Sequence, residues 1–357
     1  MEFALSEDQI MLQDSLKGMM AAASPLDDVR LVAAGDTGKA SDMSAALAEM
    51  GTPGLLIAPD HGGLGMGALE AALVQEILGG LVSPASFMAG SAMAAAAIST
   101  GGSADQKTDW LPRIASGEVR FGVAVTENVG RRDGAGLTAS AGTLSGAALF
   151  ALEAETATHL LVADQSSGLN IVDASAARIS PLTTIDKTRV YSEVTFDGAA
   201  AIALEDGSAA LDRMIALGRI LLAADSLGAM QTMLDKAVAY AGERKQFGRL
   251  IGSFQAVKHM CAEMAAKLEP CRALVWHAAY TFDTDPEKAA LMACLAKSHI
   301  NEVGTFVART ATEVHGGMGF TDLLGLHYWF KRIGVNRQLL GSPEMLRAEA
   351  AQLQGWV

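Results

Sequence analysis

Residues 240–248, YAGERKQFG, determine how the rest of this chain is interpreted. A long helical pattern, from about residue 208 to residue 242, ends here, and another begins at about residue 253. Between them lie Arg244, Gln246 and Phe247, followed by Gly248. An arginine and an amide beside an aromatic ring can hold an anion while stacking on a flat ring. The stretch is also compatible with an ordinary helix corner, in which Gly248 makes the turn and Arg244 is solvated.

Composition and charge exclude several classes of protein. The chain has 357 residues, half of them hydrophobic, so it is long enough for two or three domains with a large core. The net charge of -13 argues against nucleic acid or an anionic membrane as the main partner. Its three cysteines, Cys261, Cys271 and Cys294, fit no metal site. Because the N-terminus also lacks a signal-peptide stretch, we expect a cytoplasmic protein with buried free thiols and no metal.

The hydrophobic period changes twice along the chain, which predicts three domains: 1–118, 119–206 and 207–357. The first is helical, and Ser6 with Gln9 predicts a capping box at its start. The second contains short strands, including one over residues 189–196, in which Val190, Val194 and Phe196 alternate with polar or aromatic neighbours. Without helices between the strands, this region is a compact antiparallel β unit and not a Rossmann domain. The third domain is an antiparallel helical bundle.

A glycine-rich corner interrupts the helical pattern of the last domain at residues 313–320, EVHGGMGF. Its three glycines let a backbone approach a ligand closely. The same run is also typical of a helix C-cap followed by a turn.

The order of helices, strands and helices, with these two corners, resembles the acyl-CoA dehydrogenase family. Three segments carry the resemblance, which covers nearly the whole chain: residues 102–118, GSADQKTDWLPRIASGE; residues 243–248 with 254–257, ERKQFG and FQAV; and residues 313–320. The resemblance implies an α+β, mostly α fold: an N-terminal helical domain, a central antiparallel β-barrel-like domain and a C-terminal antiparallel four-helix bundle. It also implies FAD as cofactor, and dimers or dimers of dimers.

The resemblance assigns cofactor contacts to both corners and to the β domain. In such proteins the arginine and phenylalanine of the second segment meet the FAD of a neighbouring subunit, and a guanidinium fork suits a pyrophosphate. The glycine corner takes the adenosine side, and the strand that includes residues 125–127 seats the isoalloxazine ring. The residues implied are Val125, Thr126, Phe150, Arg244, Gln246, Phe247, Gln255, Glu313, Gly316, Gly317 and Gly319.

The chain departs from the family pattern at several of these positions. Glu313 stands where many members carry Gln, Phe150 where a Trp is frequent, and Leu152 where a Thr is common. The loop NVGRRDG, residues 128–134, replaces a Pro-Gly-Ala-Gly-Ser-Asp-like loop. Its two arginines can meet CoA phosphates or can simply be solvated, and we favour the latter.

The family reaction needs a carboxylate base over the α-carbon of an acyl-CoA thioester. The family carries its glutamate at one of two places, which align with Gly218 and Gly341, and glycine cannot take a proton. Glu344 is the candidate substitute base in this chain. Asp225 lies about 10 Å along the helix from Gly218, which makes it a poor substitute.

Three hypotheses follow from this pattern. The chain is an FAD-dependent acyl-CoA dehydrogenase with an unconventional base, active as a homo-oligomer. Alternatively, it resembles the partner subunit of a heteromeric acyl-CoA dehydrogenase, some of which act on CoA thioesters of steroid side chains, and requires a paralogous chain. A flavin oxidase or monooxygenase of the same fold is the third. The family implies an acyl-CoA thioester as substrate, from fatty acid or steroid side-chain β-oxidation, and electron-transfer flavoprotein as acceptor.

Overall fold

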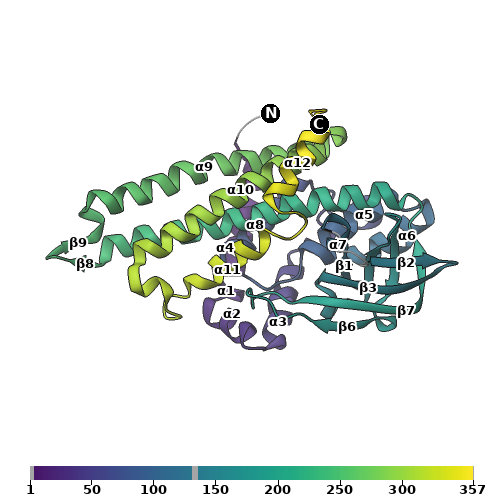
Figure 1. The fold of residues 1–357 in the computed structure, drawn as a ribbon. Coiled ribbons are helices and arrows are strands. Elements are labelled where there is room, and N and C mark those ends of the chain that lie inside the picture. The colour runs from purple at the N-terminus through teal and green to yellow at the C-terminus, as the bar shows by residue number, and fades with distance from the viewer. Residues whose placement is uncertain (1–3, 131–135, 357) are drawn as a thin grey trace.

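The chain folds into helices, then strands, then helices again, as the computed structural model in Figure 1 shows; it describes residues 4–130 and 136–356. The N-terminal part contains a π-helical turn, η3, directly before α5. The predicted capping box at Ser6 forms, and Ser103 makes a second one. The longer elements of this part are α1 (Glu7–Ala23), α2 (Leu26–Ala33), α3 (Thr37–Glu49), α4 (Ala68–Gly80), η3 (Met88–Met93), α5 (Ala94–Gly101) and α6 (Ala104–Ala115).

The strands form one seven-stranded sheet in the order β2-β3-β1-β4-β5-β7-β6, with an additional β3–β7 pairing that curls it toward a barrel. All pairs are antiparallel except β1–β4, which is parallel. The strands are β1 (Phe121–Ala124), β2 (Gly136–Ser140), β3 (Thr143–Leu152), β4 (His159–Ala163), β5 (Leu169–Asp173), β6 (Arg178–Pro181) and β7 (Tyr191–Ala203).

Three details of the β domain differ from the sequence prediction. The first strand ends at Ala124, and Thr126 already begins the short helix α7 (Thr126–Val129). The strands β2 and β6 were not anticipated from the sequence. Val190 is exposed whereas Tyr191 is buried, because the chain enters β7 only at Tyr191, against the core formed with the N-terminal helices.

The C-terminal part is a helical bundle whose central element is α8 (Gly207–Glu243). A two-stranded hairpin, β8 (Lys245–Gln246) with β9 (Arg249–Leu250), turns the chain into the next helix. The remaining helices are α9 (Gln255–Thr284), α10 (Pro286–His315), α11 (Leu326–Asn336) and α12 (Pro343–Leu353), with the 3-10 turn η7 (Gly316–Phe320) between α10 and α11. The predicted fold class is therefore confirmed.

Helix α8 is long and apolar enough to cross a membrane, but 89% of its most apolar window is buried inside the protein. It packs against α4, α9, α10 and α11, so its apolar character is that of a core helix. In Figure 1 it runs from the β domain to the hairpin at the opposite end of the molecule.

A buried ion cluster joins the β domain to the C-terminal bundle beside α8. Asp225 of α8 pairs with Arg189, which precedes β7, and lies 3.5 Å from Arg332 of α11. Arg332 also pairs with Asp186 at 2.9 Å, and Asn336 donates to Asp225 at 2.7 Å. Each charge in this cluster has an opposite partner, as burial requires.

Candidate functional site

The first position of the missing base, Gly218, is closed by neighbouring side chains. A Cβ atom added to Gly218 would lie 2.6 Å from Cδ1 of Leu340 and 2.9 Å from Cε of Met93. Carbon atoms in contact are normally about 3.5–4.0 Å apart. In this structure the flexible ends of Leu340 and Met93 fill the space in which a glutamate side chain would start, and both would have to shift to admit one.

The second position, Gly341, lies in a loop held by two buried cations. Arg219 donates to the carbonyl of Leu340 at 3.0 Å, and Lys297 donates to the carbonyl of Gly341 at 2.8 Å. Leu340 and Gly341 both have positive φ, 53° and 111°. A Cβ atom at Gly341 would meet Leu346 at 3.1 Å and Val129 at 3.4 Å, so this position is also tight.

Lys297 is an unusual lysine, because it is fully buried and has no carboxylate partner among the described residues. Burial, with the nearby charge of Arg219, lowers its pKa to about 7. Arg219 itself is paired with Glu349 at 2.6 Å. The side chains of Arg219 and Lys297 thus bind backbone carbonyls of the loop.

The candidate base Glu344 lies on the surface, in the first turn of α12. It pairs with Arg337 at 3.2 Å, and its side chain is 65% exposed. Hydrogen bonds from its own backbone and from Ser342, with the charge of Arg337, lower its pKa. A lowered pKa weakens a general base at neutral pH, so its catalytic role stays a prediction.

The predicted flavin seat lies at the end of β1 and β3. Val125 is buried, and the Thr126 hydroxyl donates to the carbonyl of Phe150 at 3.0 Å. Phe150 has a φ of 57° and a side chain that is 40% exposed. Leu152, by contrast, is buried in the core. The seat therefore offers an exposed aromatic ring and backbone groups. Residues 131 and 132, the two loop arginines, lie outside the described residues.

The other predicted cofactor-binding residues lie on or beside the hairpin at the C-terminal end of α8, where they are exposed to solvent. Arg244 and Gln246 are exposed, and Phe247 is 92% exposed although it stacks edge-on against Phe254. Gln255 is exposed at the start of α9. The contact of Phe247 with a cofactor of a neighbouring chain stays a prediction.

The glycine corner lies at the same end of the bundle as the hairpin. His315, the last residue of α10, stacks on Tyr240 near the end of α8, with ring centroids 4.6 Å apart. Glu313, Gly316 and Gly317 are exposed, and a Cβ atom at either glycine would meet nothing within 4 Å. Gly319 is different, because its Cβ would lie 2.5 Å from the carbonyl oxygen of Thr312.

The predicted cofactor contacts therefore form two groups. Val125, Thr126 and Phe150 belong to the β domain, beside α7, and a Cβ atom at Gly341 would lie 3.4 Å from Val129 of that helix. The other group lies at the hairpin end of α8, which extends about 25 residues, or about 38 Å, beyond Gly218. Each group includes an exposed aromatic ring, Phe150 in the first and Phe247 in the second.

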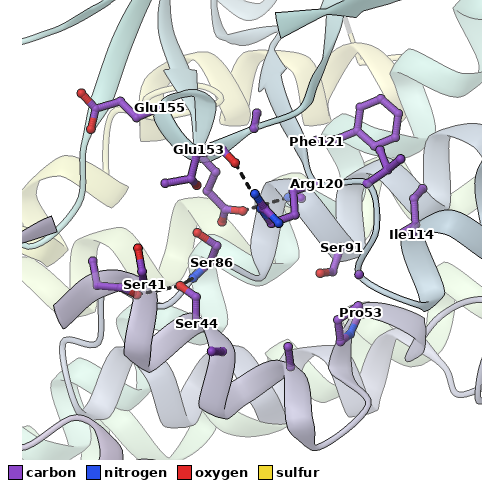
Figure 2. Close-up of a pocket in the computed structure, with 18 of the residues that line it drawn as sticks. Ser41, Ser44, Pro53, Ser86, Ser91, Ile114, Arg120, Phe121, Glu153 and Glu155 are labelled. Carbon is purple, nitrogen blue, oxygen red and sulfur yellow. Dashed lines mark hydrogen bonds between the residues drawn. The ribbon is translucent and has the colours of Figure 1, made fainter. Parts of the chain in front are cut away.

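A separate cavity of about 650 Å³ lies between α3 and the β domain, and none of the predicted site residues line it. Figure 2 shows Ser41 and Ser44 of α3 on one side and Glu153, Glu155 and Arg120 on the other. The half-buried Glu153 accepts hydrogen bonds through its carboxylate from the backbone of residues 87, 89 and 90, at 3.2, 3.2 and 2.9 Å. Burial raises its pKa, although these three donors oppose the shift.

The contacts of Glu153 were not anticipated from the sequence. Its three donors open the π-helical turn η3, which ends at Met93, beside Gly218. Three backbone N–H groups thus occupy most of the acceptor sites of the Glu153 carboxylate. Glu153 has a positive φ of 53°, and this backbone conformation cannot be read from the sequence.

Comparisons with known proteins agree with this architecture. The family models for the N-terminal and C-terminal domains of acyl-CoA dehydrogenases match residues 6–118 and 205–353. The acyl-CoA dehydrogenase IpdE2 of Mycolicibacterium smegmatis is 28% identical over 98% of this chain and 100% of its own length. The L-prolyl-[peptidyl-carrier protein] dehydrogenase of Pseudomonas fluorescens is 31% identical over 79% of this chain and 82% of its own. A solved variant of the Tcur3481-Tcur3483 steroid ACAD superposes with a TM-score of 0.88, at 26% identity, over 98% of both chains.

Proposed function

Because this chain belongs to the acyl-CoA dehydrogenase family, we propose that it acts in FAD-dependent α,β-dehydrogenation of an acyl-CoA thioester as a subunit without a catalytic base. One observation carries this proposal. The side chains of Leu340 and Met93 fill the space beside Gly218, where a base would begin. The tight packing at Gly341 supports the same conclusion.

FAD is the cofactor of the family, and when bound it accepts the β-hydrogen of the substrate as hydride. Arg244 of this chain would hold the pyrophosphate of an FAD shared with a neighbouring chain, because its guanidinium is exposed and can donate two parallel hydrogen bonds. Phe247 would cover apolar cofactor surface beside it, and the open backbone at Gly316 and Gly317 would admit the adenosine side.

The proposal requires a second chain that brings the base and the acyl pocket. A paralogous acyl-CoA dehydrogenase chain fits this need, since it would present the same fold with a glutamate at the position of Gly218. The name of the Tcur3481-Tcur3483 steroid ACAD joins two gene products, which supports a heteromeric assembly and a steroid side-chain thioester as substrate class. We place the complex in the cytoplasm, with electron-transfer flavoprotein as electron acceptor.

The test compares the chain purified alone with the chain co-expressed with such a paralogue. The visible flavin spectrum is recorded before and after a panel of acyl-CoA thioesters is added. We expect bleaching by a thioester only in the complex. Bleaching by the isolated chain would refute the base-less role, and Glu344→Gln would then test the homo-oligomeric alternative. A complex that no thioester reduces would refute the activity itself.

A further inference from the structure

The two side chains that close the base position are brought there by irregular backbone. Met93 is the last residue of the π-helical turn η3, directly before α5. Leu340, in the loop before α12, has a left-handed φ of 53°. π-helical turns and non-glycine residues with positive φ are uncommon, and both occur preferentially at functional sites. Two separate irregularities thus deliver apolar side chains to one point, beside Gly218.

The ends of these two side chains occupy the space directly beside Gly218. Met93 and Leu340 are both fully buried. A Cβ atom added to the glycine would lie 2.6 Å from Cδ1 of Leu340, 2.9 Å from Cε of Met93 and 3.1 Å from its Sδ. Each of these distances is shorter than an ordinary contact between non-bonded atoms. No further carbon atom fits beside the glycine while both side chains keep these positions.

The backbone around Leu340 is held by buried cations. Arg219 donates to the carbonyl of Leu340 at 3.0 Å, and Lys297 donates to the carbonyl of Gly341 at 2.8 Å. Arg219 is fixed in turn by two hydrogen bonds to the Glu349 carboxylate, at 2.6 and 2.7 Å. A strained backbone conformation persists only where its surroundings over-determine it. The position of Leu340 is therefore set by the bundle.

The π-helical turn that ends at Met93 is held from the β domain. Its residues 89 and 90, with residue 87 directly before it, donate their N–H groups to the carboxylate of Glu153. Glu153 follows β3 in the chain. The two side chains beside Gly218 are thus anchored through different parts of the fold, Leu340 through the bundle and Met93 through the β domain.

We propose that Met93 and Leu340 form a plug that fills the acyl-binding space of this chain, so that the chain takes up no acyl-CoA thioester of its own. The inference rests on the proposed function, because the two base positions, Gly218 and Gly341, are what place the α-carbon of a thioester here. It goes beyond the missing base, since the plug excludes the acyl chain itself. In the assembly, the thioester is then bound by the partner chain alone.

The test measures the binding of octanoyl-CoA to the full chain by calorimetry in the presence of added FAD. Coenzyme A without an acyl group is the control ligand. We expect the wild-type chain to bind octanoyl-CoA no more tightly than coenzyme A. Met93→Ala/Leu340→Ala should bind octanoyl-CoA at least about tenfold more tightly than the wild type, because burial of about two methylene groups already contributes that factor. Its binding of coenzyme A should not change.

The matched control variant is Met43→Ala/Leu47→Ala, which removes a similarly buried methionine and leucine from α3 and should bind like the wild type. The proposal is overturned if the wild type binds octanoyl-CoA more tightly than coenzyme A, or if the double variant gains no more than this control. Where the melting temperature shows that the double variant does not fold, Met93→Ala and Leu340→Ala are measured singly, and at least one must show the gain.

Flavin bleaching separates this inference from the proposed function. A wild-type chain that binds octanoyl-CoA without bleaching of its flavin overturns the plug and leaves the base-less role intact. Bleaching by the isolated wild-type chain refutes both. A double variant that gains binding but still bleaches no flavin supports both, because the plug is then removed and the base is still missing.

Discussion

Replacing Gly218 by alanine tests whether the base position is closed. The new methyl group would lie 2.6 Å from Leu340 and 2.9 Å from Met93. Overpacking of this kind costs about 1–3 kcal/mol, whereas the better helix propensity of alanine returns about 1 kcal/mol. We therefore expect a net loss of up to about 2 kcal/mol, or a fall in melting temperature of a few degrees for a chain of this size.

The same helix offers a matched control. Gly242 is exposed near the end of α8, and a Cβ atom there meets nothing within 4 Å. Gly242→Ala should therefore be neutral or slightly stabilising. Thermal unfolding is followed by circular dichroism at one fixed protein concentration, because association shifts the apparent stability.

A double variant identifies the cause of the loss. Leu340→Ala alone removes a fully buried side chain and should cost about 2–5 kcal/mol. Combined with Gly218→Ala it should cost less than the sum, since the added methyl then enters vacated space. If Gly218→Ala stabilises the protein as much as Gly242→Ala, the position is open, and the main support for a base-less subunit fails.

Three further predictions concern charges. The pKa of Lys297 is lowered to about 7 from 10.5, so the unfolded chain binds more protons than the folded chain between these pH values. Stability should therefore rise from pH 7 to pH 10. Lys297→Met should flatten this rise, which is measured as the urea midpoint at each pH. Although burial raises the pKa of Asp225, its arginine partners lower it overall. The stability that the ionised Asp225 contributes should thus be lost only below about pH 4. Asp225→Asn leaves the buried charges of Arg189 and Arg332 without this carboxylate, so it should lower the free energy of unfolding at pH 7 by about 3–5 kcal/mol. Arg244→Ala should lower the flavin content of the purified complex without changing its melting in the flavin-free state, whereas Arg178→Ala, at another exposed arginine, should retain the flavin.

The sequence predicts those features that depend on local pattern. The capping box at Ser6 and the course of α8 follow from side chains that act within a few turns. The end of β1 at Ala124 was missed, because Thr126 turns inward to bond the carbonyl of Phe150, which is distant in sequence. Val190 was placed on the wrong face for a related reason: the packing of Tyr191 overrides the alternation.

The candidate site shows the same difference between local features, which the sequence predicts, and long-range contacts, which it does not. The glycines at residues 218 and 341 can be read from the sequence. The side chains that fill the space beside them, where a glutamate would lie, cannot. Met93 reaches Gly218 from a π-helical turn whose first N–H groups bind the Glu153 carboxylate, and no short motif encodes such a contact. Sequence reasoning finds a missing group more readily than it finds what replaces it.

The closed base position and the exposed cofactor contacts are physically independent. The loop before α12 is fixed from within the bundle by Arg219 and Lys297, which donate to successive carbonyls while Leu340 holds a left-handed conformation. We expect a partner that docks on the exposed Phe247 to leave that loop unchanged, because the hairpin end of α8 lies about 25 residues, or about 38 Å, beyond Gly218. Association can therefore complete a cofactor site without creating a second chemical centre in this chain. A subunit that lacks the base but contributes cofactor contacts needs its cofactor surface to form without any change at the base position.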